Sequence, residues 1–102
     1  MVKGAMSSRN ELLSAEERKN AAVISETLFK AKELVTQNSV VELAEWIEKN
    51  INKSPFLTVE YVEIVDNEKL QPVKNWNEKN TKVACVAAFC GKVRLIDNIV
   101  LN

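Results

Sequence analysis

The sequence contains no histidine and only two glycines, and both absences exclude kinds of chemistry. Without histidine, the chain lacks the side chain that most often serves as a general base near neutral pH. Gly4 and Gly91 lie far apart, so no glycine-rich loop is available to wrap the phosphates of a nucleotide. The chain is therefore not expected to be a self-sufficient nucleotide-binding enzyme.

Cysteine is also scarce. Cys85 and Cys90 lie an odd number of residues apart on one predicted strand, so they should point to opposite faces and cannot form a disulfide there. Because there is neither a C-x-x-C pair nor a histidine, no metal site is expected. The pattern is typical of a cytoplasmic protein with reduced thiols.

Neither sign of charge is in excess, since 14 Lys and Arg residues balance 14 Asp and Glu residues. A neutral chain has no general attraction for nucleic acid or for an anionic membrane, and neither is expected as a partner. The sequence also shows no apolar run long enough to span a bilayer and no signal peptide. Its 102 residues are enough for one small domain. Any anion site must therefore be built from a few well-placed groups.

Two segments have the pattern of amphipathic helices. Ser14-Ala15-Glu16-Glu17 is a capping box, and apolar residues at helical spacing predict a helix that continues to about Gln37. Ser39-Val40-Val41-Glu42 is a second capping box, and it predicts a helix through about Asn50. Trp46 could either extend the apolar face of that helix or serve as an exposed contact.

The following segment predicts a strand at the edge of a sheet. Leu57 to Val65 is rich in β-branched and aromatic residues, and its alternation of apolar and polar residues slips between Tyr61 and Val62. One irregularity is therefore expected at that point. Residues 68–76 then form a connection in which one helical turn is possible.

The most apolar run, Lys82 to Cys90, is apolar on both faces and predicts a central strand. Gly91-Lys92 has the chemistry of a type II′ hairpin turn, so the next strand, about Val93 to Leu101, should pair back antiparallel. The predicted fold is α+β, with two helices packed on a three-stranded antiparallel sheet. Two helices can cover only one face, and the small Ala84 and Ala88 could let another surface approach the second face. Long side chains and the connecting loop are the alternative cover.

A short polar motif, Met6-Ser7-Ser8-Arg9-Asn10, offers groups suited to binding phosphate. Serine hydroxyls and backbone amides can donate to phosphate oxygens, and a guanidinium can bind two oxygens at once. The alternative is a solvated N-terminal tail, because Ser-Ser-Arg is common in exposed loops.

The pair M-S-S-R-N near the start and R-L-I-D-N at Arg94–Asn98 resembles the C-terminal domain of the pantothenate synthetase (pantoate–β-alanine ligase) family. Leu13–Arg18 and Tyr61–Asp66 also look like that family. The resemblance runs from Met6 to the last residue, so residues 6–102 are interpreted as a C-terminal lid domain. Within residues 1–5, Val2-Lys3-Gly4-Ala5 stands where the family carries D-G-L-A. These five residues are expected to be a flexible lead or to mark a cut through a longer protein.

The resemblance implies an AMP-forming ligase that joins pantoate to β-alanine through pantoyl adenylate, with ATP and Mg²⁺. Most catalytic groups of the family lie in its N-terminal nucleotide-binding domain, which would be the partner of this chain. On this basis Met6, Ser7, Ser8 and Arg9 would bind ATP, and Arg9 would be the catalytic residue because it stabilises charge on the leaving pyrophosphate. No metal ligand is assigned to this chain, and the chain alone is expected to be inactive.

For Arg94, Asp97 and Asn98, alternation along a strand favours structural roles over a catalytic cluster. Arg94 should share one face with Asn98, and Leu95 should share the other with Asp97. A rival hypothesis is a stand-alone interaction module whose exposed sheet face binds a protein.

Overall fold

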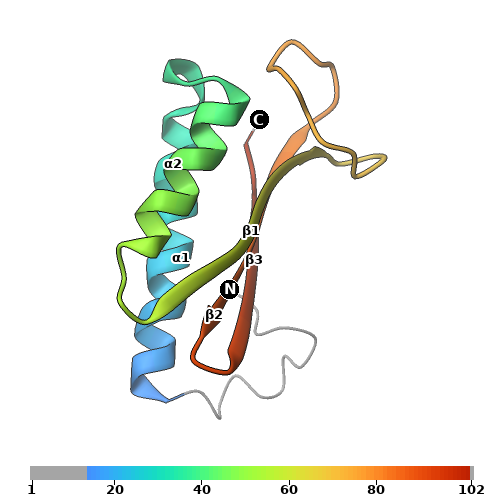
Figure 1. The fold of residues 1–102 in the computed structure, drawn as a ribbon. Helices are drawn as coiled ribbons and strands as arrows, with labels where there is room; N and C mark the ends of the chain where they lie inside the picture. Colours follow the sequence, from blue (N-terminus) through green and yellow to red (C-terminus); the bar gives the residue numbers. More distant parts are fainter. Residues whose placement is uncertain (1–13, 102) are drawn as a thin grey trace.

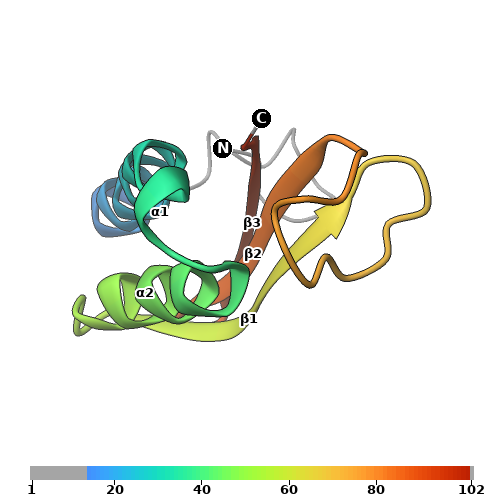
Figure 2. The ribbon, with the colours of Figure 1, turned by 90° about the horizontal axis from the view of Figure 1, so that it is seen from above.

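Two helices lie against one face of a three-stranded sheet in the computed structural model, which describes residues 14–101. Figures 1 and 2 show both helices on the same side of the strands. The elements follow in the order α1 (Ala15–Glu33), the short 3₁₀ helix η2 (Val35–Gln37), α2 (Val40–Asn52), β1 (Leu57–Asp66), β2 (Lys82–Cys90) and β3 (Val93–Val100). The predicted α+β architecture is confirmed.

Both predicted capping boxes are present. The Ser14 hydroxyl accepts from the amide of Glu17 at 3.1 Å, while the Glu17 carboxylate accepts from the amide of Ser14 at 3.0 Å. Ser39 and Glu42 make the same reciprocal pair at the start of α2. These bonds satisfy amide groups that a helix start otherwise leaves without partners, so each helix begins where the sequence predicts.

The first helix is shorter than predicted. It ends at Glu33, and Val35–Gln37 tightens into the 3₁₀ turn η2 instead of continuing to Gln37 as α-helix. The side-chain amide of Asn38 donates to the carbonyl oxygen of Leu34 at 3.1 Å. The same carbonyl oxygen also accepts from the amide of Gln37 at 3.0 Å, so two bonds hold the turn that leads toward α2.

Polar side chains join the two helices. The buried Thr27 hydroxyl donates to the carbonyl oxygen of Val23 and accepts from the Asn50 side-chain amide, both at 2.8 Å. A second link lies further along, where the Ser54 hydroxyl donates to the side-chain oxygen of buried Asn20 at 2.7 Å. Because each bond requires one relative position of α1 and α2, this polar seam fixes how the two helices are aligned.

The sheet has the order β1-β2-β3, with β2 in the centre as predicted. Ala84, Val86 and Ala88 are fully buried and belong to the core beneath the helices. The suggestion that Ala84 and Ala88 lie on the second face is therefore wrong. Their small side chains lie in the core between α2, which packs mainly on β1, and α1, which packs mainly on β3. Trp46 is partly buried against the same core, which confirms the core interpretation.

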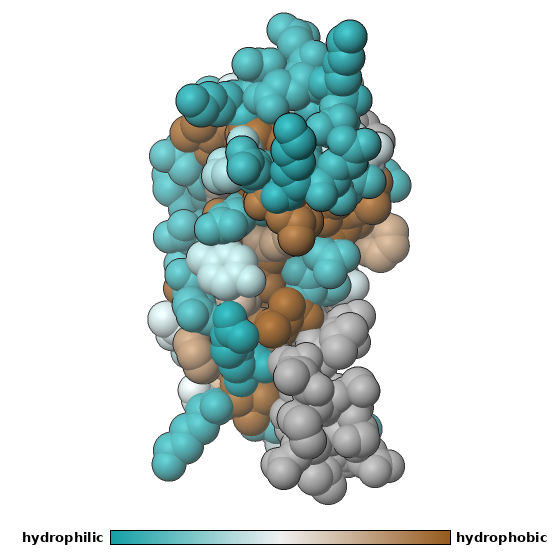
Figure 3. All heavy atoms as spheres, turned by 90° about the vertical axis from the view of Figure 1, so that its right-hand side faces the viewer, coloured by the Kyte–Doolittle hydropathy of each residue, from teal (hydrophilic) through white to brown (hydrophobic). Residues whose placement is uncertain are grey.

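The other face of the sheet, called the open face below, carries no helix among the described residues. Side chains alternate along a strand, so the β2 residues that alternate with the core residues lie on the open face. The β3 residues paired with them lie on it too. Figure 3 shows hydrophobic residues grouped on the side of the molecule away from the helices, with hydrophilic residues around them. From β2 and β3 the open face carries Val83, Cys85, Ala87, Phe89, Arg94, Ile96, Asn98 and Val100.

The edge strand β1 contains one bulge, but not at the predicted point. The register shifts between Val59 and Tyr61, so Glu60 is the extra residue. Beyond it, Tyr61 stands opposite Ala87 on the open face and Val62 opposite Val86 on the core side. Two neighbouring apolar residues are enough to reveal a slip in alternation, yet they do not show which residue is extruded.

The β2–β3 connection matches the predicted type II′ turn. Gly91 has a φ of 61°, and it is the only turn residue of the pair with positive φ. Such a φ at the first position is easily adopted only by glycine. Cys85 and Cys90 are both free thiols, and burial raises the pKa of each. Neither has the lowered pKa of a reactive cysteine.

The loop between β1 and β2 leaves the sheet at the end opposite the β2–β3 hairpin (Figure 1). No residue from 68 to 76 belongs to a helix, and a single turn of helical type, from the Leu70 amide to the Asp66 carbonyl oxygen at 3.0 Å, lies at the start of this loop. The Asp66 carboxylate organises the loop, accepting from the amides of Glu68, Lys69 and Gln71 at 3.0, 2.7 and 3.3 Å. An aspartate that binds its own following backbone offers these amides an alternative to helix.

A buried lysine closes the other end of this loop. Lys82 begins β2 and is 2% exposed. Its ammonium group donates to the carbonyl oxygen of Asn80 at 2.9 Å and to that of Glu78. These oxygens replace part of the hydration that burial removes, so the bonds hold the end of the loop against the strand.

The polar seam predicts a specific effect of Thr27→Val. Valine keeps the shape but leaves the Asn50 side-chain amide without its acceptor, so we expect a loss of about 1–3 kcal/mol in unfolding free energy. Urea unfolding followed by circular dichroism measures it. Thr27→Ser is the matched control because it keeps the hydroxyl, and equal losses in both variants would contradict a role for the hydrogen bond.

A pH-dependent effect is expected at Asp66. The amide of Lys69 is the main cause that lowers the pKa of its carboxyl from 3.8, against a smaller opposing effect of burial. A lowered pKa stabilises the fold above the ordinary value, and this contribution is lost as pH falls through the lower, folded-state pKa. The melting temperature of Asp66→Asn should therefore lie below that of the parent at neutral pH and converge with it under acid conditions. A constant difference across the titration would contradict this.

Candidate functional site

The predicted ATP-binding residues Met6, Ser7, Ser8 and Arg9 lie outside the described residues. The first described residue, Ser14, follows Arg9 by five positions in the sequence. What the structure does describe is the element that the motif leads into, namely the start of α1 and the surfaces around it.

The start of α1 borders an open hollow of about 470 Å³. Three segments form its wall: the first turn of α1, the residues that lead into β1, and the β2–β3 hairpin. The lining includes Ser14, Glu17, Phe56, Phe89 and Gly91. The start of the helix that follows the motif in the sequence and the hairpin therefore lie at the same end of the molecule.

This helix start is not itself suited to an anion. Glu16 and Glu17 place two acidic side chains in its first turn, and the Ser14 hydroxyl already accepts from the amide of Glu17. After burial, Glu17 and then Glu16 are the causes that raise the pKa of the nearby Cys90 thiol. A site with this negative charge disfavours phosphate.

Arg94, in the second motif, forms an ion pair across the sheet. Its Nε lies 2.8 Å from Glu60 Oε1, on the bulge of β1. Arg94 stands opposite Phe89 of β2, so the pair spans the central strand from one edge strand to the other. The hydrogen bond to Glu60 is the main cause that raises the pKa of the arginine further above its usual range. Its guanidinium therefore already has a carboxylate partner.

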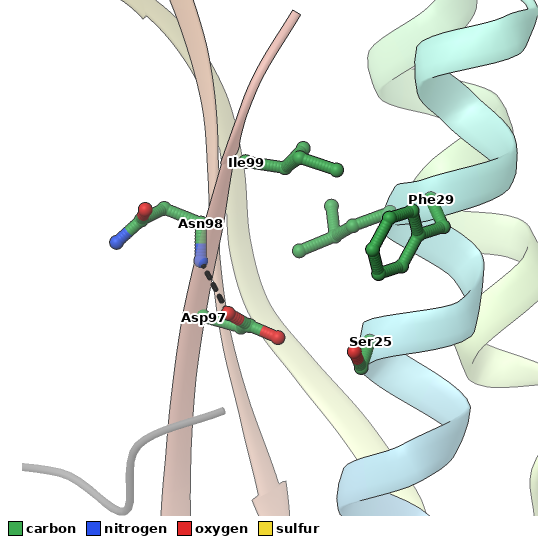
Figure 4. A pocket seen from close by; sticks show the side chains of 6 residues that line it. Ser25, Phe29, Asp97, Asn98 and Ile99 are labelled. Atoms are coloured by element: carbon green, nitrogen blue, oxygen red, sulfur yellow. Dashed lines mark hydrogen bonds between the residues drawn. The ribbon is translucent and has the colours of Figure 1, made fainter.

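Asp97 lies on the other side of β3. Figure 4 shows its side chain directed toward α1, beside Ser25 and Phe29, while the Asn98 side chain points the opposite way. These residues line a hollow of about 230 Å³ between α1 and β3. Asp97 Oδ1 accepts from the amide of Asn98 at 2.8 Å. The structure thus separates Arg94 from Asp97, and the two do not form one cluster.

Glu60 is not predicted from the sequence as the partner of Arg94. The two are 34 positions apart, and Glu60 lies at the bulge of β1. The only available signal was an acidic residue inside an irregular stretch of an edge strand. Without the site of the bulge, neither its face nor its partner on another strand can be deduced.

A third hollow, of about 300 Å³, lies between α2 and β1. Its lining is largely apolar and includes Val41, Ala44, Val62 and Pro72, with Glu45 and Glu48 at its border. It brings together no nucleophile and base. Within residues 14–101, no group of three or more potential metal-binding side chains is close enough to hold an ion. In the same part of the chain, no helix combines the length and apolar character needed to cross a membrane.

The Arg94–Glu60 pair should act as a surface ion pair. Both side chains are about two-fifths exposed, so water and salt screen their attraction. Arg94→Gln should lower the melting temperature only slightly in low salt, and the difference should vanish in high salt. Glu60→Gln is the matched variant and should behave alike. A large decrease that persists in high salt would mean that Arg94 has a packing role.

The sequence and the fold are similar to those of several pantothenate synthetases. The chain is 52% identical over 95 residues to the pantothenate synthetase of Bacteroides fragilis strain YCH46, covering 93% of this chain and 34% of that protein. It is 41% identical over 98 residues to that of Flavobacterium psychrophilum, covering 96% and 35%. The crystal structure of the Thermus thermophilus enzyme matches with a TM-score of 0.79 and 34% identity, over 93% of this chain and 34% of that one.

These matches concern one region of a longer protein, since the chain spans about a third of the length of the curated relatives it matches. The family description for pantoate-beta-alanine ligase matches residues 3–100. That range contains both M-S-S-R-N and R-L-I-D-N and every helix and strand of the described fold. The chain therefore belongs to the pantoate-beta-alanine ligase family.

Proposed function

We propose that residues 6–102 form the C-terminal lid domain of an ATP-dependent, AMP-forming ligase that condenses pantoate with β-alanine. The observation that carries this proposal is the family match over residues 3–100, which includes the M-S-S-R-N motif, in a chain about a third as long as its relatives. The partner in this proposal is the N-terminal nucleotide-binding domain, which supplies the remaining catalytic groups.

The reaction proposed has two steps. The pantoate carboxylate attacks the α-phosphate of ATP, which gives pantoyl adenylate and releases pyrophosphate. The amine of β-alanine then attacks the acyl carbon, and AMP leaves. In the first step, negative charge moves onto the departing pyrophosphate, and a cation held beside it stabilises that transition state.

The motif supplies groups for this charge. Ser7 and Ser8 donate hydroxyl and amide hydrogen bonds to the ATP phosphates, and Arg9 binds two phosphate oxygens with its planar guanidinium. Met6 lies against the adenosine in this proposal. Asn10 shapes the loop through bonds to nearby backbone. Arg9 is the residue with a catalytic role because its positive charge acts where negative charge develops.

Features of the described region support assigning phosphate binding to the M-S-S-R-N motif rather than to the helix that follows it. The first turn of α1 carries Glu16 and Glu17, and the chain has no net charge to attract a nucleotide. The only cation of the M-S-S-R-N motif is Arg9. The capped and packed α1 supplies a rigid support for the segment that precedes it.

Magnesium would accompany the nucleotide in this reaction. Among the described residues 14–101, no three potential metal-binding side chains lie together, so none is assigned to the ion. The motif offers hydroxyls and a guanidinium, which suit phosphate oxygens. Ligands for the ion would therefore come from ATP and from the other domain, and no step here depends on a metal held by this chain.

The open face of the sheet is the surface proposed to meet the N-terminal domain. No described helix covers it, and it carries apolar side chains such as Phe89, Ile96 and Val100, the last 48% exposed. The charged Arg94–Glu60 pair lies on the same face, near the hairpin. An apolar patch with a charged border is typical of a surface that contacts another domain.

The decisive variant is Arg9→Ala, made in an enzyme that joins this chain to the remaining part found in its relatives. Losing one contact made mainly in the transition state should cost about 2–4 kcal/mol, a decrease of roughly thirty- to a thousandfold in the rate of adenylation. Single-turnover formation of pantoyl adenylate measures this rate.

Arg9→Lys serves as the matched control and should recover only part of the rate, because an ammonium cannot reproduce the two-pronged contact. Neither variant should change the melting temperature appreciably. The chain alone, incubated with ATP, magnesium, pantoate and β-alanine, should release no AMP above background. Near-normal adenylation by Arg9→Ala together with a large fall in melting temperature would contradict the proposal.

A further inference from the structure

The strand β3 lies at an edge of the sheet, and its backbone pattern shows which groups face outward. The amide of Leu101 donates to the carbonyl oxygen of Lys82 at 2.8 Å, so residues in step with Leu101 direct their amides and carbonyls toward β2. By the alternation of an antiparallel ladder, Ile96, Asn98 and Val100 direct theirs toward the free edge.

The opposite edge of the sheet is closed. On β1, the outward amide of Val59 donates to the Asn52 side chain at 3.1 Å. Further along, the amide of Asp66 donates to the carbonyl oxygen of Gln71, and the carbonyl oxygen of Ile64 accepts from Val73. Side chains and the β1–β2 loop therefore occupy several of the positions at which another strand could bind.

On β3, one hydrogen bond among the described residues occupies an outward backbone group, and it joins two residues that are neighbours in sequence. Asp97 Oδ1 accepts from the outward amide of Asn98 at 2.8 Å (Figure 4). Apolar groups flank this edge on both sides of the sheet. Phe29 of α1 is 67% exposed on the helix side, and Val100 is 48% exposed on the open face. Exposed apolar flanks beside free backbone groups are the features of an edge that can add a strand.

A second copy of this chain fits the edge in one antiparallel register. With a two-fold axis at Asn98, Ile96 of each copy stands opposite Val100 of the other, and two apolar pairs form on the open face. On the helix side, α1 lies along β3 and carries the exposed Glu26 and Lys30 beside Phe29. This surface carries both signs of charge, with Lys30 beside Glu26 and Glu33.

Asp97 opposes this pairing in two ways. Its carboxylate occupies the Asn98 amide, which lies at the centre of the register. In the paired state it would also face Ile99 of the other copy, and the two Asp97 residues would be diagonal neighbours about 7–8 Å apart. Two carboxylates at that distance repel each other in a place with little water.

We propose that the β3 edge is a latent pairing surface for a second copy of this chain, and that Asp97 keeps it closed. The carboxylate blocks strand pairing at an edge that no loop among the described residues covers. The inference does not depend on the proposed ligase function, because it uses only the backbone pattern, the flanking side chains and the position of Asp97.

The test is the mass of the 102-residue chain in sedimentation velocity over a wide range of concentration. The parent should remain at its monomer mass of 11.5 kDa, whereas Asp97→Ala should rise with concentration toward twice that mass. Glu48→Ala, which removes one exposed carboxylate from α2, is the matched control and should remain monomeric. A parent that dimerises as readily as Asp97→Ala, or a folded Asp97→Ala that stays monomeric throughout, would overturn the proposal.

Two further variants locate the contact. Asp97→Asn keeps an oxygen that can accept from the Asn98 amide but loses the charge, so it should associate less than Asp97→Ala. Adding Asn98→Pro to Asp97→Ala removes the outward amide, which an edge strand tolerates, and should restore the monomer. Association unchanged by that proline would contradict pairing through β3.

Hydrogen exchange of the parent provides an independent measurement if Asp97→Ala does not fold. The Asn98 amide is bonded to Asp97, whereas the outward Ile96 amide has no recorded bond within residues 14–101. The Asn98 amide should therefore exchange several-fold more slowly. Equal exchange at the two positions would remove the closure on which the proposal rests.

Discussion

The packing of two helices on one face of the sheet is the constraint on which the rest of this structure depends. α2 lies mainly along β1 and α1 along β3, Ala84, Val86 and Ala88 of β2 are fully buried in the core beneath them, and a larger side chain at either alanine would disturb this packing. The polar seam through Thr27 and Asn50 then fixes how the helices are aligned above those small residues. Close packing and directional hydrogen bonds thus act on the same interface, the first setting its distance and the second its alignment.

That constraint makes the two faces of the sheet different. Both helices pack on the core side. Among the described residues, only loops and single side chains can therefore cover the open face and the two sheet edges. At the β1 edge, Asp66 binds three following amides and folds the loop back along the strand. At the β3 edge, only the Asp97 carboxylate performs a similar task among the described residues. Asp66 therefore organises a loop at the β1 edge, and Asp97 blocks strand pairing at the β3 edge.

Patterns with local causes could be predicted from the sequence. The capping boxes at Ser14 and Ser39, the central strand and the Gly91 turn each depend on neighbouring residues, and the structure has them where expected. Features that depend on distant contacts could not be located. The position of the bulge is decided by how β1 pairs with β2, and the orientation of Ala84 and Ala88 by which side the helices cover. The same holds for the candidate site. The M-S-S-R-N motif can be recognised in the sequence, whereas the pairing of Arg94 with Glu60 can be seen only in the folded sheet.

The arrangement of charge connects this fold to the proposed chemistry. A neutral chain whose first helix begins with two glutamates gives a phosphate little reason to bind at the start of that helix. Arg94, the cation of the second motif, is already paired with Glu60. Within the two motifs, Arg9 is the other cation. A ligase that closes over its nucleotide benefits from such a division, because a phosphate-binding charge carried at the border of a domain can approach the nucleotide while the core behind it stays unchanged. Under the proposed function, the stability of the fold and the binding of the nucleotide depend on different residues.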